Sequence, residues 1–238
     1  MTVRRVARIV FAVFAVLAAA APPVPLRAQA YPSTPLETRI KALAGKLAPE
    51  LIELRRDIHR NPELGLHETR TSALVADRFR RLGLEVRTGY AQTGVVGILR
   101  GGRPGPVVAL RGDMDALPIT EETGLPFASK ATAVVDGRRT GLMHACGHDI
   151  HTTLLVGVAA VLAAVRADLP GTVVFIAQPA EECCDGAGRM IADGAFRDPV
   201  PEAFFAYHVD DTLKAGRVGY ASGFMSANVD GFDLEIRS

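Results

Sequence analysis

One nine-residue segment, 143–151, concentrates side chains that can bind a metal ion. It holds one thiol, three imidazoles and one carboxylate, from Cys146, His144, His148, His151 and Asp149. Thiolate and imidazole donors together suit zinc or another late first-row ion. A structural cysteine beside surface histidines is the alternative, but the density of such groups favours a site. Since not all five can touch one ion, we expect Cys146 and His148 to be ligands, supported by Asp149 and His144.

The backbone of this segment is predicted to be extended or turning. The i, i+2 spacing of Cys146 and His148 places alternate side chains on one face of such a backbone. Cys146 could also be the nucleophile of a cysteine protease. That interpretation gives no role to the neighbouring histidines or to the glutamate pair described next.

A second chemical signal is the adjacent pair Glu181 and Glu182, which follows a short apolar run. Neighbouring side chains point in different directions, so one carboxylate can bind metal while the other moves a proton at the open coordination position. A solvated turn is the alternative for such a pair. His208 also ends an apolar segment, and we expect it to be a further ligand.

Two aspartates, Asp113 and Asp115, follow another apolar run and share one face by their i, i+2 spacing. We expect Asp115 to support a ligand. The role of Asp113 stays open between binding metal, orienting a neighbour and pairing with an arginine.

The predicted strands and helices that must position these residues alternate along the chain, and this alternation predicts an α/β sandwich. Acidic residues at the ends of buried strands mark the working edge of such a sheet. Helices are predicted by apolar spacing and by glycine or proline stops over residues 36–61, 68–82, 153–167 and 187–194. Strands are predicted over residues 93–100, 106–110, 171–177 and 204–208, with a turn at 101–105.

Residues 1–30 have the organisation of a signal peptide. Three arginines precede an apolar run over residues 9–21, and an A-x-A pattern ends at Ala30. An uncleaved membrane anchor is the alternative, but the run is short and prolines interrupt it. We therefore expect export to the periplasm or the medium, cleavage near Ala30 and no stable membrane anchor.

Charge and cysteine usage exclude several classes of protein. Residues 1–30 contain four arginines and no acidic residue, so processing would change the formal charge from +1 to −3. That balance does not support nucleic-acid binding. Three cysteines do not make a disulfide framework, and the adjacent Cys183 and Cys184 allow at most a strained vicinal bridge. The sequence also has no serine-hydrolase elbow and no phosphate-binding loop at a strand-to-helix junction.

Five segments in order resemble peptidase family M20, the aminoacylase and carboxypeptidase-G family, and most closely its amidohydrolase branch. They are residues 56–65, 111–118, 143–149, 178–182 and 208–209. The resemblance implies a zinc-exopeptidase-like catalytic domain over residues 31–226, with a central mixed sheet flanked by helices.

The same resemblance implies a centre of two manganese or zinc ions. By position, the metal ligands would be Cys146, His148, Glu182 and His208, and Glu181 would be the general base and acid. The implied reaction is hydrolysis of the amide bond of N-acyl amino acids or similar small amides.

The sequence departs from the family pattern in three ways. Cys183, Cys184 and Asp185 replace glycines that usually follow the glutamate pair. Residues 227–238 resemble the first strand of the family's α+β lid and dimerisation domain, so we expect a truncated lid, and a homodimer only where the lid is present. The family's C-terminal histidine ligand and its lid histidine have no counterpart. A catalytically inactive metal-binding fragment, or an aminopeptidase or dipeptidase on the same scaffold, are therefore alternatives.

Overall fold

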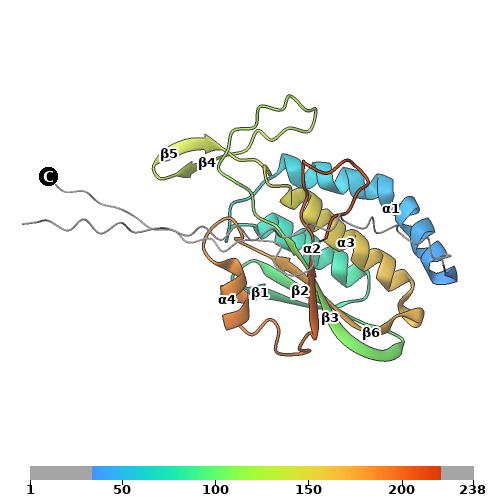
Figure 1. The fold of residues 1–238 in the computed structure, drawn as a ribbon. Helices are drawn as coiled ribbons and strands as arrows, with labels where there is room; N and C mark the ends of the chain where they lie inside the picture. The colour runs from blue at the N-terminus through green and yellow to red at the C-terminus, as the bar shows by residue number, and fades with distance from the viewer. Residues whose placement is uncertain (1–33, 221–238) are drawn as a thin grey trace, which may run out of the picture. The chain divides into compact units, whose positions relative to one another are not determined.

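The computed structural model describes residues 34–220, and the predicted signal peptide and lid strand lie outside the described residues. A mixed five-stranded sheet with the order β1-β2-β6-β3-β7 forms the centre. Helices α1, α2 and α3 pack on one face and α4 packs on the other, and each face has its own apolar core (Figure 1). The α/β class and the mixed sheet flanked by helices are confirmed.

Helix α1 spans Pro35–Arg60 as a single helix, and each end agrees to within one residue with the range 36–61 predicted for one or two helices. Thr34 caps its start: the Thr34 hydroxyl accepts from the Glu37 amide, and the Glu37 carboxylate accepts from the Thr34 amide. The helix ends at Asn61, ahead of Pro62, as expected because a residue before proline disfavours helix. Among the described residues, no helix is long and apolar enough to cross a membrane.

Helix α2 (Thr69–Arg81) and strand β2 (Gly94–Arg100) agree with the predicted ranges to within one residue. Between them lies β1 (Glu85–Tyr90), which the sequence did not predict. Strand β1 is an edge strand, paired only with β2 in the described sheet, and none of its residues is fully buried. Its polar sequence therefore carries no apolar run or clear alternation for prediction to detect.

Strands β3 (Arg103–Asp113), β6 (Pro170–Gln178) and β7 (Ala203–Ala206) run parallel to one another. Residues 103–105, expected to lie in a turn, belong to β3, so that prediction was wrong. Asp113 pairs with Gln178 and Arg111 with Ala206, so the carboxyl ends of all three strands meet at one edge. This register delivers Asp115, the glutamate pair and His208 to the same place.

Helix α3 (His148–Ala164) begins five residues earlier than predicted. Gly147 adopts a left-handed conformation (φ 83°), and this lets the chain turn directly into the helix. His148, Asp149 and His151 therefore lie in the first turns of a helix, and the extended backbone expected for this segment is limited to the residues before Gly147.

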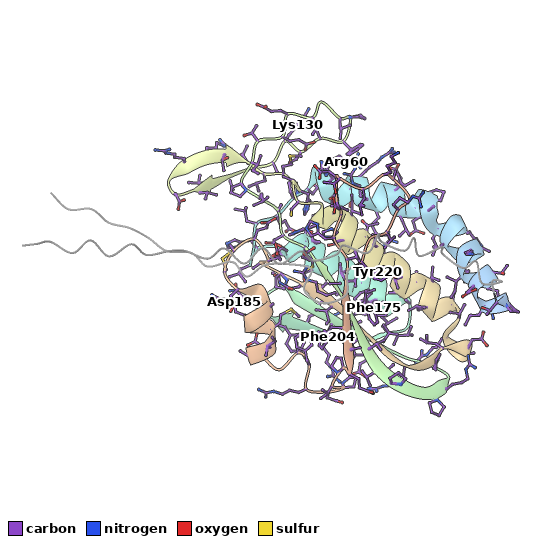
Figure 2. The ribbon with its side chains drawn as sticks, viewed as in Figure 1. Arg60, Lys130, Phe175, Asp185, Phe204 and Tyr220 are labelled. Atoms are coloured by element: carbon purple, nitrogen blue, oxygen red, sulfur yellow. A yellow bond between two sulfur atoms is a disulfide. The ribbon has the colours of Figure 1, made fainter. Side chains whose placement is uncertain are left out.

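The remaining elements are short. Helix α4 (Gly186–Ala192) follows the loop that carries Asp185, and a 3₁₀ helix covers Arg166–Asp168 (Figure 2). Strands β4 (Thr132–Val135) and β5 (Arg138–Gly141) form a hairpin that projects away from the main sheet (Figure 1) and was not predicted.

The contact between α2 and β2 depends on a glycine. A Cβ at Gly97 would lie 2.5 Å from Cδ2 of Phe79, which is fully buried and packs on Phe175 at a ring-centroid distance of 5.7 Å. We expect Gly97→Ala to lower the free energy of unfolding by about 1–3 kcal/mol through overpacking. Urea denaturation would measure it.

Gly45→Ala in α1 is the matched control. No atom lies within 4 Å of a Cβ built there, and alanine is the better helix former, so stability should rise by up to about 1 kcal/mol. An unchanged midpoint for Gly97→Ala would contradict the packing described.

Candidate metal centre

The candidate centre lies where the carboxyl ends of β3, β6 and β7 meet the start of α3. Residues 113–115 continue from β3, residues 179–182 from β6, and residues 207–209 from β7. His148 opens α3 beneath these segments and is fully buried. Three strand ends and one helix start thus supply the candidate ligands.

The first ligand group contains Cys146, His148 and His208. One ligand atom from each lies within 4.8 Å of the others, and Cys146 Sγ lies 3.4 Å from His208 Nε2. A thiolate with two imidazoles is a donor set suited to zinc and similar ions.

The second ligand group contains His148, Glu181 and Glu182, again with ligand atoms within 4.8 Å of one another. His148 Nε2 lies 3.8 Å from Glu181 Oε2 and 3.7 Å from Glu182 Oε1. His148 therefore belongs to both groups, so the two groups adjoin.

Unpaired buried atoms test whether these residues fit a cation. His148 Nε2 and Glu182 Oε1 are buried and have no hydrogen-bond partner among residues 34–220. A buried polar atom without a partner is costly, and a bound cation would satisfy both atoms. The donor set therefore fits a divalent ion.

Asp115 supports both ligand groups. Its Oδ1 lies 3.2 Å from His148 Nδ1, and its Oδ2 accepts from the amide of Glu182 at 2.9 Å. Burial acts to raise the pKa of Asp115, but the hydrogen bonds from His148 and the backbone hold it below its usual range. An ionised Asp115 fixes His148 with Nε2 directed away from it, as expected for a group that orients a ligand.

Asp113, whose role the sequence left open, is also kept ionised. Burial acts to raise its pKa, but the hydrogen bond from His151 and the charge of Arg111 lower it. Arg111 Nη1 lies 2.5 Å from Asp113 Oδ2. Two buried carboxylates beneath His148 make this edge of the sheet favourable to cations.

The thiol of Cys146 is protonated at neutral pH in the absence of metal. Burial raises its pKa to about 12, and the neighbouring Glu182 adds to the effect. Only a cation can favour the thiolate in this anionic surrounding, so metal binding here would release a proton.

Asp149 and His144, expected to support Cys146 and His148, face another group of side chains. Asp149 Oδ2 lies 2.8 Å from His59 Nδ1 and 2.7 Å from Arg55 Nε. His144 is buried, and burial lowers its pKa to about 4. Its ring lies 6.4 Å from that of His59. Both residues thus pack the start of α3 against α1, and Asp115 is the carboxylate that bonds His148.

Sequence reasoning missed Glu68. This glutamate is fully buried, and it accepts from the Ala180 amide at 2.8 Å and from the Thr93 hydroxyl at 2.5 Å. Ala180 has a positive φ of 51° and directly precedes Glu181. Glu68 therefore holds the turn that presents the glutamate pair. In the sequence it looks like an ordinary polar residue at a helix start.

A disulfide joins Cys183 and Cys184, directly after Glu182. Gly65 approaches this loop so closely that a Cβ would lie 2.7 Å from Cys183 Sγ. The vicinal bridge that the sequence allowed is therefore present.

Comparison with known proteins identifies the scaffold. Residues 109–236 match the model of the family described as peptidase family M20/M25/M40. The N-acetylcysteine deacetylase of Bacillus subtilis is 42% identical over 188 residues, or 79% of this chain and 47% of the relative. The IAA-amino acid hydrolase ILR1-like 2 of Arabidopsis thaliana is 41% identical over 186 residues, or 78% of this chain and 40% of the relative.

Among solved structures, the YXEP protein of Bacillus subtilis, described as a dinuclear metal binding peptidase from the M20 family, is similar with a TM-score of 0.62. It is 40% identical, and the match covers 73% of this chain and 45% of that protein. The chain spans about half the length of the curated relatives it matches.

The burial of Glu68 predicts a pH dependence of stability. Burial raises the pKa of Glu68 from its ordinary value, so the folded state binds its proton more tightly than the unfolded state does. That contribution to stability is present at low pH and is lost as the pH rises through the folded-state pKa. Glutamine has no ionisable group, so in Glu68→Gln this contribution to stability does not change with pH. The free energy of unfolding of the variant, relative to wild type, should therefore rise with pH above about 4.3.

Urea denaturation of both metal-free proteins across this range measures the difference. Parallel pH profiles would show that Glu68 does not contribute as described.

Proposed function

This chain belongs to peptidase family M20/M25/M40, and on that premise we propose that it hydrolyses the amide bond of N-acyl amino acids or similar small amides. The observation that carries the proposal is His148 Nε2, a buried and unpaired nitrogen common to two ligand groups. The products would be a carboxylic acid and an amino acid.

Four residues would hold the metal: Cys146, His148, Glu182 and His208. We propose two divalent ions, manganese or zinc, because these donors combine a thiolate, imidazoles and a carboxylate. When bound, such ions acidify a water molecule and polarise the amide carbonyl.

Glu181 is the proposed general base and acid. The Glu182 amide is bonded to Asp115, and 21% of the Glu182 side chain is exposed, against 41% for Glu181. Both carboxylates lie near His148 Nε2, but Glu182 is the more buried of the two, and Glu181 is the more accessible to solvent and substrate. Glu181 would take a proton from the attacking water and give it to the leaving nitrogen as the C–N bond breaks.

The substrate class rests on the activities of similar proteins. A deacetylase of N-acetylcysteine and a hydrolase of IAA-amino acids both act on amides of amino acids. Turnover of substrates with a free amine would instead favour a dipeptidase.

We also propose that residues 1–30 direct export and are removed near Ala30, leaving no stable membrane anchor. Their arginines, apolar run and A-x-A pattern support this. Residues 227–238 would begin a lid and dimerisation domain, and a homodimer would form through that lid. No nucleic-acid partner is proposed.

Cys146→Ser should weaken metal binding at least tenfold, because a serine hydroxyl is a poorer donor than a thiolate for such ions. Equilibrium dialysis against a series of zinc concentrations, followed by elemental analysis, would give the zinc affinity and the number of ions bound per folded chain. His67→Gln, a change to an exposed histidine outside the centre, should leave the count unchanged. Equal zinc affinities for wild type and Cys146→Ser would refute the ligand assignment.

Glu181→Gln should lower kcat for an N-acyl amino acid by about 10²–10⁴-fold while metal stays bound, since only proton transfer is removed. Release of the free amino acid measures the rate. The exposed Glu122→Gln is the matched control and should keep full activity. Metal binding with no rate dependent on Glu181 would identify a non-catalytic metal-binding protein.

A further inference from the structure

We propose that His151 is a positioning residue that holds the ligand segment of His208 against the metal centre. The proposal rests on the proposed function only in taking His208 as a ligand. The competing assignment makes His151 itself a ligand, since Asp113, His148 and His151 also have ligand atoms within 4.8 Å of one another.

Both ring nitrogens of the fully buried His151 are already used. Its Nδ1 lies 2.7 Å from Asp113 Oδ1, and the Val209 amide donates to its Nε2 at 3.0 Å. A backbone amide can only donate, so Nε2 must be the acceptor and the ring proton is on Nδ1, where it donates to Asp113. Neither nitrogen is left for a metal ion.

The backbone of Val209 links His151 to His208, because its amide and its carbonyl oxygen bond one ring each. Its carbonyl lies 2.6 Å from His208 Nδ1. A carbonyl can only accept, so His208 carries a proton on Nδ1 and keeps the lone pair of Nε2 free. That Nε2 is the atom 3.4 Å from Cys146 Sγ. A continuous path therefore runs from Asp113 through His151 and Val209 to the metal-facing atom of His208.

The segment around His208 is attached to α3 at further points. The Tyr207 hydroxyl donates to the carbonyl of His151 at 2.9 Å, and the rings of His151 and His208 lie 4.6 Å apart. Gly147 leaves room for the Val209 side chain, which a Cβ at that position would strike. Since His208 and Val209 are exposed, the bond to His151 is a principal restraint on where the ligand sits.

Two substitutions separate the two bonds of His151. In His151→Gln, the amide oxygen lies near the place of Nε2 and can accept from Val209. In His151→Asn, the side-chain amide can still donate to Asp113 but is too short to reach Val209. Circular dichroism and urea denaturation would establish that both variants fold.

The first measurement is hydrogen exchange of the Val209 amide in the metal-free full chain. We expect exchange at least tenfold faster in His151→Asn than in wild type, and near wild type in His151→Gln. In wild type, a scalar coupling across the hydrogen bond between the Val209 nitrogen and His151 Nε2 should also be present. Absence of this coupling, or unchanged exchange in His151→Asn, would overturn the proposal without reference to any variant's activity.

The second measurement is zinc affinity by equilibrium dialysis with elemental analysis. Groups that orient a ligand typically contribute 10–100-fold in affinity, so His151→Asn should lose about that much, and His151→Gln should recover most of it. An equal loss in both variants would instead favour direct ligation by His151. A wild-type chain that binds no zinc would contradict the proposed function, while the exchange measurement would still decide the role of His151.

Discussion

The candidate centre depends on the hydrogen bond between Asp115 and the Nδ1 of His148. It commits one ring nitrogen to a buried carboxylate and leaves the other directed at two groups of ligands. The second oxygen of the same carboxylate accepts from the Glu182 amide, so one side chain fixes residues from α3 and from the loop after β6. Loss of this pairing would leave a buried charge unpaired and free the ring to turn.

The parallel register of β3, β6 and β7 makes that bond possible. Strands that end at one edge bring together residues 113–115, 179–182 and 207–209 without any long loop. His151 of α3 holds residues 207–209 by accepting from the Val209 amide. Glu68 holds residues 179–182 by accepting from the Ala180 amide. Rigid elements thus supply the ligands, and buried polar groups beside them set their direction.

The sequence predicted the class of fold and the residues with evident chemistry because both leave local signals. Apolar runs marked the central strands, and the density of imidazole, thiol and carboxylate groups marked the site. It did not predict β1, whose edge position needs no apolar run, or the early start of α3, which depends on the conformation of Gly147. The roles of Glu68 and His151 depend on partners 112 and 58 residues away, and no local pattern reports such contacts. Asp149 bonds His59 and Arg55, which lie 90 and 94 residues before it, and no local pattern reports those contacts either.

Strand β7 has a consequence for how the sheet can grow. Within the described part of the chain, β7 pairs only with β3, and Phe204 and Phe205 on its opposite faces are 57% and 59% exposed (Figure 2). An edge with open backbone groups and uncovered aromatic rings is a template for one more strand. His208 follows the end of β7 by two residues, so a strand added at this edge would lie close to a proposed ligand. The open edge of the described sheet and the proposed ligand are therefore only two residues apart along the chain.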